Sequence, residues 1–467
     1  MTFHADFTSQ NYFRDPGAAI DKLRNQGPLV EVRFPIIGRV WTTTNQALAD
    51  QVLKDTATFT IRKDDGTVAG FRWWMPGIVR TLANSMLSMD EPDHKRLRDI
   101  VDEAFRRRAV LEMEPHIQAT GDALAAELFA EGSPADLVER FARKLPLSVI
   151  TELLGLPLAD RSKFIAWAGG FTRFTGALGF LGMIPNVFAM KRYMERHLEI
   201  VRQQGGEGLI AEIVRVGKDG GQISPDEIVA MVFLLLFAGH ETTTHLISGS
   251  VHELLINPDL RDWLEEDWSR VDLAVEEFLR FITPVQFTKP RYVRKDIELG
   301  GVRLRKGDRI MVMLAAANMD PQANDHPERL ALQRRPNRHI AFGTGIHFCL
   351  GHQLARIEAR CALKSLFQRW PGLTLAVKES EITWRKRPGL RAIDRLPVRA
   401  VGKARTGSQP DRTGSFARRE DSSTARWLLP SHDCCSNTTL REHLTLIPAS
   451  SCARRFLATP LGEIIPS

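Results

Sequence analysis

Cysteine is scarce in this chain of 467 residues, and no two cysteines form a CxxC pair. The five cysteines are Cys349, Cys361, Cys434, Cys435 and Cys452. Disulfide frameworks and structural zinc sites both need closely or regularly spaced cysteines, so this scattered set disfavours both. One zinc alternative stays open, an interaction protein that uses His347, Cys349 and the cysteines near the C-terminus. The cysteine pattern as a whole indicates a reducing compartment.

Recognisable targeting and membrane-spanning segments are also lacking. The N-terminus, MTFHADFTSQNYFRDP, mixes acidic and polar residues, whereas a signal peptide needs a basic start followed by an apolar stretch. The apolar segment 228–239 is too short to span a bilayer, and segment 171–190 is interrupted by Arg173 and four prolines or glycines. We therefore expect a cytoplasmic protein without a membrane partner.

Basic residues outnumber acidic ones, but they do not gather into blocks. The chain has 63 Lys and Arg against 56 Asp and Glu, a net charge of +7. Because the cations are dispersed among carboxylates and are not interleaved with aromatic residues, the pattern disfavours nucleic acid as a partner. Arg106–Arg108 is a local exception, and it fits either a docking surface for an acidic protein or a solvated helix face.

The composition, 43% hydrophobic and 25% charged, is typical of a globular protein, and the length allows one large core or two ordinary ones. Apolar residues follow a helical spacing over most of 91–279. Strand-like alternation is confined to 29–44 and 297–314, where Gly300-Gly301 predicts a tight hairpin turn. The sequence therefore predicts a mainly α protein with small β-sheets.

One helix is delimited by its own end signals. Ser224-Pro225-Asp226-Glu227 combines an N-cap serine, a proline in the first helical position and a glutamate that closes a capping box. Nothing interrupts the helical pattern before Asn257-Pro258. A helix of about 30 residues is about 45 Å long, enough to cross the whole molecule as its central element.

The character of the chain changes after Val401. The stretch GKARTGSQPDRTGSFARREDSSTAR is polar and has no sustained apolar period. Such composition cannot bury enough apolar surface to offset the entropy of ordering the chain. We expect a globular domain over residues 1–401 and a tail over 402–467 that is disordered or unrelated to the fold.

The sharpest chemical signal is the segment FGTGIHFCLG, residues 342–351. Gly343 and Gly345 permit a tight turn, and Gly351 lets the following helix approach a flat cofactor closely. Cys349 lies just before that helix, whose N-terminus should lower the pKa of the thiol and favour a thiolate. A buried structural cysteine in a glycine-rich loop is the alternative that these residues leave open when taken alone.

The ten residues match the pattern FxxGxxxCxG and resemble the haem-binding loop of the cytochrome P450 family. The resemblance extends over residues 15–397 and implies that family's fold, with a long central helix over a buried haem. It makes Cys349 the thiolate ligand of haem b. It also implies that Phe342 packs against the haem, that Gly343 and Gly351 shape the loop, and that His347 donates a hydrogen bond to a propionate. A solvent-exposed loop histidine is the alternative for His347.

A second motif, AGHETT, occupies residues 238–243 inside the long helix. Glycine and successive hydroxyl residues are poor choices for a helix interior, and they fit close packing on another helix as well as contact with a cofactor or oxygen. The Thr242 hydroxyl can donate a hydrogen bond to an upstream carbonyl. The segment resembles the oxygen-activating AGxETT motif of the same family. The resemblance places Ala238 and Gly239 against the haem and makes Glu241 and Thr242 an acid–alcohol pair that relays protons to bound dioxygen.

Further charged residues gain meaning only from the resemblance. Glu277 and Arg280 match an ExxR pair that is a buried structural lock in the family, although an i, i+3 pair alone is common on helix surfaces. His94 and Arg98 lie one helical turn apart, and together with Arg291 they match cations that the family directs at the haem propionates. Without the resemblance each would be an ordinary surface cation.

The resemblance also implies a substrate and electron donors. The family's substrate-contact segments are aromatic and apolar here and include Trp73, Trp74 and Val285, which favours a small hydrophobic substrate over a polar one. Core packing is the alternative for the two tryptophans. Because the chain has no GxGxxG motif and no flavin or iron–sulfur ligand set, it needs external electrons, and the family suggests a ferredoxin and a ferredoxin reductase. We expect a monomeric dioxygen-dependent hydroxylase. The alternatives are a peroxide-using haem enzyme and a haem-binding sensor or carrier without turnover.

Overall fold

The structure is a computed structural model that describes residues 6–35, 37–68, 85–102, 105, 107–160, 162–164, 167, 176–220 and 223–402. For residues 107–109, 158, 176–184, 187 and 216–220 it describes the backbone alone. Trp73, Trp74, Arg106 and the expected tail beyond residue 402 lie outside the described residues.

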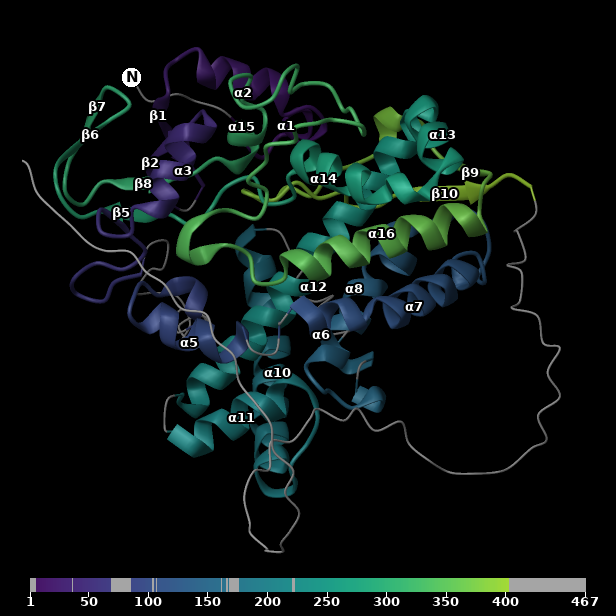
Figure 1. Ribbon diagram of the computed structural model, residues 1–467, viewed down its shortest axis with the longest axis horizontal. Coiled ribbons are helices and arrows are strands. Elements are labelled where there is room, and N and C mark those ends of the chain that lie inside the picture. The colour runs from purple at the N-terminus through teal and green to yellow at the C-terminus, as the bar shows by residue number, and fades with distance from the viewer. Residues whose placement is uncertain are drawn as a thin grey trace, which may run out of the picture. The chain divides into compact units, whose positions relative to one another are not determined.

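Three small sheets account for the described strands, as the sequence predicts for a mainly α protein. In spatial order the largest sheet contains β1 (Leu29–Phe34), β2 (Gly38–Thr43), β8 (Arg309–Met311), β5 (Arg291–Val293) and β3 (Phe59–Thr60). The second contains β4 (Ala135–Asp136), β10 (Pro397–Ala400) and β9 (Leu373–Leu375). The third is the hairpin of β6 (Ile297–Leu299) and β7 (Val302–Leu304). In Figure 1 the largest sheet and the hairpin lie on the left and the long helices at the centre and right.

The predicted hairpin turn is confirmed. Leu299 pairs with Val302, so Gly300 and Gly301 are the two central residues of the turn. Their φ angles are +56° and +75°, a backbone conformation that glycine adopts without steric cost and other residues rarely adopt.

Helices form the rest of the fold. They are α1 (Gln10–Arg14), α2 (Gly17–Arg24), α3 (Gln46–Lys54), α5 (Asp93–Asp102), α6 (Arg107–Glu112), α7 (Glu114–Glu127), α8 (Lys144–Leu153), α10 (Gly176–Gln204), α11 (Gly208–Gly220), α12 (Pro225–Ile256), α13 (Pro258–Glu266), α14 (Val271–Ile282), α15 (Leu314–Asn318) and α16 (His352–Arg369).

Helix α12 begins and ends where its capping signals predict. The Ser224 side chain accepts a hydrogen bond from the backbone N–H of Glu227, and the Glu227 carboxylate accepts one from the backbone N–H of Ser224. The helix has 32 residues and ends at Ile256. Figure 1 shows it passing through the middle of the helical part behind α16, with which it is in contact. It is the central element that the sequence predicts.

Segment 228–239 is too short to span a membrane, but the whole of α12 is long and apolar enough to do so by length and composition alone. However, 72% of its most apolar window is buried inside the protein. Packing in the interior therefore explains the composition, because a helix that is apolar all round is typical of a protein core.

The two halves of α12 contribute to different apolar clusters. Residues 228–236 pack with α5, α8, α10 and α11, whereas residues 246–254 pack with α7, α14 and α16. Residues 1–407 nevertheless form one compact unit. The AGHETT motif falls between the two clusters, at the point where the apolar packing along the helix is interrupted.

Candidate functional site

A cavity of about 420 Å³ opens beside this interruption. Ala238, Gly239 and Thr242 of α12 line one wall, and the loop from Phe342 to Gly351 lines another. The two motifs, about 100 residues apart in the sequence, therefore share one cavity. Its walls are predominantly apolar, and Val285, predicted to contact substrate, is among the lining residues.

The loop that carries Cys349 is held against α3. Gly345 has a φ of +72°, and a Cβ atom built there would lie 2.3 Å from the carbonyl oxygen of Leu53, so only glycine fits. The backbone N–H of Cys349 donates a 3.0 Å hydrogen bond to the Phe342 carbonyl, which closes the loop. A Cβ at Gly351 would meet no atom within 4 Å, because this position faces the cavity. The predicted tight turn fits both Gly345 and Gly343, whose φ is +69°, while the approach of a cofactor to Gly351 stays a prediction.

The predicted net lowering of the Cys349 pKa is not found, because burial outweighs the effect of the helix terminus. Helix α16 begins at His352, and burial raises the pKa of the Cys349 thiol. The backbone N–H of Gly351 and the positive charges of Arg98 and Arg356 act in the opposite direction without cancelling burial. The isolated loop therefore favours a thiol. Since a coordinating metal ion deprotonates a thiol outright, thiolate formation here depends on metal binding.

Basic side chains, two of them histidines, gather around His347 in the cavity. They are His94, Arg98, Lys289, Arg291 and His347. His94 and Arg98 come from α5, Arg291 opens β5, and His347 belongs to the Cys349 loop. The rings of His94 and His347 meet edge to face with centroids 4.5 Å apart. The structure thus brings together all four residues that the sequence assigned to propionate binding and adds Lys289, which the sequence reading missed.

Among the described residues that line the cavity, Glu358 is the one acidic residue, and within the basic group Arg98 pairs with Asp102. Burial and the charges of Arg291, His94, Lys289 and Arg98 lower the pKa of His347 to about 2. The Nε2 atom of His347 is buried and has no hydrogen-bond partner. Burial also lowers the pKa of Arg291 to about 10. An anionic group here would relieve the repulsion and accept the hydrogen bond, so these residues fit the two carboxylates of a haem.

Arg98 connects this basic group to the cysteine loop. Its guanidinium donates hydrogen bonds of 2.8 Å to the Phe348 carbonyl and to the Asp102 carboxylate. Phe348, directly before Cys349, is 37% exposed. The Cys349 loop therefore has one face on the cavity and one near the protein surface.

Small side chains of α12 also line the cavity. The Thr242 hydroxyl donates a 2.8 Å hydrogen bond to the Ala238 carbonyl, as the sequence predicts. A Cβ at Gly239 would lie 3.2 Å from the side chain of Ile150 in α8. Gly239 thus permits close helix packing and also lines the cavity, and its contact with a cofactor stays a prediction.

Glu241 points away from the cavity, unlike its neighbour Thr242. The carboxylate forms an ion pair with Arg387, and the nearest nitrogen of His245 is 3.9 Å away. Burial alone would raise the pKa of Glu241. The nearby ring of His245 and the charges of Arg387 and His240 outweigh burial and lower the pKa of Glu241 to about 2. Glu241 is consequently a carboxylate at neutral pH.

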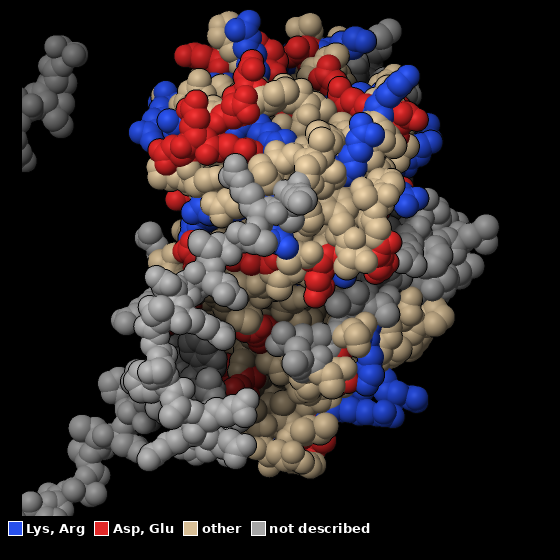
Figure 2. Space-filling model, turned by 90° about the vertical axis from the view of Figure 1, so that its right-hand side faces the viewer, with Lys and Arg blue, Asp and Glu red and all other residues tan. Residues whose placement is uncertain are grey.

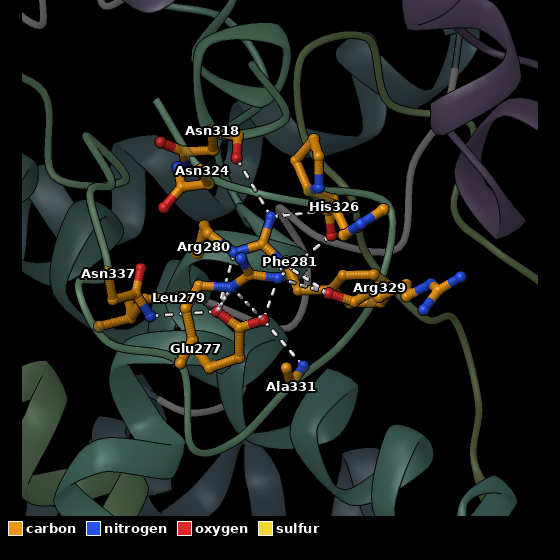
Figure 3. Close-up of polar contacts among 12 residues, drawn as sticks. Glu277, Leu279, Arg280, Phe281, Asn318, Asn324, His326, Arg329, Ala331 and Asn337 are labelled. Carbon is orange, nitrogen blue, oxygen red and sulfur yellow. Dashed lines mark hydrogen bonds and ion pairs between the residues drawn. The ribbon is translucent and has the colours of Figure 1, made fainter. Parts of the chain in front are cut away.

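Glu277 and Arg280 form the buried pair that the sequence placed in a structural role. Both side chains are 0% exposed, and two parallel hydrogen bonds of 2.8 Å join them (Figure 3). Arg280 also donates to the carbonyls of Asn318 and Pro327, while Glu277 accepts from the Ala331 backbone. The pair ties α14 to the chain segment that leads to the Cys349 loop.

Glu358 is a second residue that the sequence reading missed. It belongs to α16, lines the cavity and is fully buried. Burial raises its pKa to about 8, and a hydrogen bond with Thr243 of α12 only partly opposes this. The sequence does carry a signal for Glu358, which is a single carboxylate on the otherwise apolar face of the helix LARIEARCAL. Only the structure shows that this face is buried, and burial is what gives Glu358 its raised pKa.

Replacing Glu358 with glutamine should stabilise the protein at neutral pH. Between pH 4.5 and about 8 the folded state keeps the Glu358 proton while the unfolded state releases it, so this carboxyl favours unfolding as the pH rises. The gain in the free energy of unfolding should be about 1–3 kcal/mol at pH 7 and should vanish near pH 4.5. Urea unfolding at both pH values measures it, with exposed Glu379→Gln as the control. A gain independent of pH would contradict the assignment.

Charges on the surface are mixed. Figure 2 shows one face on which basic and acidic side chains lie interspersed around a broad uncharged area. Arg107 and Arg108 are on α6, which packs against α16, the helix that follows the Cys349 loop. Among the residues that the structure describes, no group of three or more His, Cys, Asp or Glu side chains could hold a metal ion, so the zinc alternative gains no support there.

Comparison with known proteins gives a consistent result. The cytochrome P450 family model matches residues 188–381. The chain is 37% identical over 399 residues to the vitamin D(3) 25-hydroxylase of Pseudonocardia autotrophica, which covers 84% of this chain and 96% of that protein. It is 35% identical to the cytochrome P450 monooxygenase PikC of Streptomyces venezuelae, over 84% of this chain and 92% of PikC. The structure of myxobacterial cytochrome P450 CYP267B1 in complex with myristic acid superposes with a TM-score of 0.75 at 35% identity and covers 84% of this chain and 98% of that one.

Proposed function

Because this chain belongs to the cytochrome P450 family, we propose that Cys349 is the thiolate through which it holds its haem. The protein is a haem monooxygenase, as its relatives are, and it takes electrons from a redox partner and acts on a hydrophobic substrate. The observation that carries the assignment of Cys349 is its place in the wall of an apolar cavity that the small residues of α12 and a group of basic side chains also line. Cys361, the other cysteine in the described part of the chain, is buried within α16 and does not line this cavity.

The cavity residues have distinct roles in this proposal. His94, Arg98, Arg291 and His347 hold the haem carboxylates through charge and hydrogen bonds. Phe342, Gly343 and Gly351 shape the wall beside Cys349, and Ala238 and Gly239 leave room on the other side. When bound, the haem supplies the redox chemistry that activates dioxygen, with electron donation from the thiolate.

Thr242 and Glu241 transfer protons in this proposal. The Thr242 hydroxyl lines the cavity and is oriented by its hydrogen bond to the Ala238 carbonyl, so it can accept a second hydrogen bond inside the cavity. Glu241 is paired with Arg387, which is 42% exposed and reaches solvent. A carboxylate between solvent and the cavity wall is suited to bring protons inward, provided that its pairing with Arg387 loosens transiently.

Substrate, partner and domain assignments extend the proposal. Apolar residues near Val285 favour a small hydrophobic substrate that is held by burial. The position of α6 next to α16 favours an acidic ferredoxin that docks near Arg107 and Arg108 and receives its electrons from a ferredoxin reductase. The relatives cover 84% of the chain, which supports a P450 domain over residues 1–401 and a separate tail over 402–467. We further propose a cytoplasmic monomer.

Turnover with labelled dioxygen tests this function. The purified protein with ferredoxin, ferredoxin reductase and NADPH should insert one labelled oxygen atom into a hydrophobic substrate identified by its effect on the haem spin state. Thr242→Ala should still consume oxygen, but product per electron should fall about 10- to 100-fold and peroxide should accumulate, because the proton-donating hydroxyl is lost. Product formed with peroxide and never with dioxygen would favour the peroxide-using alternative. Binding without product would favour a sensor or carrier.

A further inference from the structure

His245 occupies an energetically unfavourable position in α12. The residue is 3% exposed, and neither of its buried ring nitrogens has a partner within hydrogen-bonding distance, the nearest carboxylate being that of Glu241 at 3.9 Å. Buried polar atoms are nearly always hydrogen-bonded, and an apolar residue of similar size would avoid the cost of desolvating the imidazole. A histidine retained here therefore calls for an explanation other than packing.

The surroundings of His245 connect the two members of the acid–alcohol pair. Residues three and four apart share a face of a helix, so His245 lies within about one helical turn of both Thr242 and Glu241 along α12. Its Nε2 atom is 3.9 Å from the nearest Glu241 oxygen. Thr242 lines the cavity, whereas Glu241 does not, because consecutive residues point in directions about 100° apart around a helix. Glu241 and Thr242 are adjacent in the sequence, but their side chains point in different directions. His245, one helical turn further along, lies between these two directions.

We propose that His245 is a positioning residue that carries protons between Glu241 and Thr242. The inference rests on the proposed function, since it gives the path by which protons reach the cavity wall during oxygenation. Glu241 takes a proton from solvent at the side of Arg387 and becomes a neutral acid. One nitrogen of neutral His245 accepts that proton, and the other releases its own proton toward the Thr242 hydroxyl, which passes one on into the cavity. Glu241 returns to the carboxylate, His245 becomes the other neutral tautomer, and it resets by turning or by exchanging protons.

The charges around His245 are compatible with this role. Burial lowers its pKa, as do Arg385 and Arg387, while the nearby Glu241 carboxylate raises it and His240 is a further titratable neighbour. The ring is thus neutral near pH 7, with one nitrogen able to donate and one able to accept. Arg387 cannot itself release a proton, so its part is to hold the Glu241 carboxylate at the solvent side.

The test replaces His245 in the haem-loaded enzyme. His245→Phe should retain the thiolate carbon monoxide spectrum and substrate binding, and its unfolding temperature should be equal or higher because two unsatisfied nitrogens are removed. Product per electron should fall at least about tenfold, and the solvent deuterium isotope effect on turnover should rise, because general acid–base steps typically contribute factors of this size or larger. His252→Phe is the matched control. It replaces another buried histidine of the same helix, whose ring packs against Trp384 and which does not line the cavity.

A second variant separates proton transfer from hydrogen bonding. Glutamine can donate and accept hydrogen bonds but cannot transfer a proton from one end of its side chain to the other. His245→Gln should therefore lose product per electron to the same extent as His245→Phe. It also tests the inference if the phenylalanine variant does not fold. Wild-type coupling and isotope effect in either folded variant would overturn the inference, as would loss of the thiolate spectrum in both, which would indicate a structural role. Failure of the wild-type protein to give the thiolate spectrum or oxygenated product would instead refute the proposed function.

Discussion

Replacing Cys349 with alanine should abolish the red-shifted carbon monoxide spectrum of the reduced protein and reduce monooxygenation below detection. The loop offers no second soft ligand, because Cys361 is buried within α16 and the nearest residues of the loop wall are glycine, phenylalanine and leucine. Loss of the thiolate also removes the electron donation that favours cleavage of the oxygen–oxygen bond. The spectrum and the rate of product formation measure the two effects separately.

Cys361→Ala is the matched control for this experiment. Cys361 is buried, and burial raises its pKa to about 12, so it stays a thiol and acts as a small apolar side chain. Its replacement should leave the spectrum intact and should cost about 1 kcal/mol of stability through lost packing. A thiolate spectrum that persists in Cys349→Ala, or disappears in Cys361→Ala, would show that Cys349 is not the ligand.

Replacing Glu277 with glutamine should destabilise the protein severely. Glutamine keeps the shape but removes the charge, so Arg280 would remain as a fully buried cation, with the guanidinium of Arg334 also 3.1 Å from the former carboxylate. Breaking a buried ion pair by removing one partner typically costs about 3–5 kcal/mol, because the remaining charge is not compensated. Denaturant unfolding should show this loss, and haem retention should fall with it because the pair holds the segment before the Cys349 loop.

An exposed ion pair provides the comparison for Glu277. Asp296 is 3.6 Å from Arg303 and both side chains are largely in solvent, at 55% and 79% exposure. Asp296→Asn should leave the unfolding midpoint unchanged within error, since exposed pairs are screened and contribute little. Equal effects of the two substitutions would mean that Glu277 and Arg280 do not lock the fold.

Local signals accounted for the elements that were predicted correctly. The capping box at Ser224 and the Gly300-Gly301 turn depend on backbone geometry within a few residues, and both were confirmed in place. Strands such as β3, β5 and β9 were not predicted, because two or three residues are too few to show an alternating pattern. These strands form through pairing with distant segments.

The site was predictable in its residues and much less so in its electrostatics. Burial reversed the expected direction of the Cys349 pKa and made Glu358 a near-neutral acid, and both effects depend on neighbours far away in the sequence. Arg387 and Glu241 are 146 residues apart in the sequence, so no local pattern could predict their ion pair. Desolvation and charge pairing are properties of packed side chains, and a linear pattern carries no information about them.

The sequence by itself determined the helix-rich fold, the family and the cysteine at its centre, because caps, turns and the two short motifs are encoded by neighbouring residues. Only the tertiary structure decided that Thr242 faces the cavity while Glu241 faces Arg387, and that Arg98, Lys289 and Arg291 line the same cavity as His94 and His347. The physical reason is the range of the forces involved. Backbone preferences act over a few residues, whereas burial and electrostatic coupling act between whatever side chains the completed fold brings together.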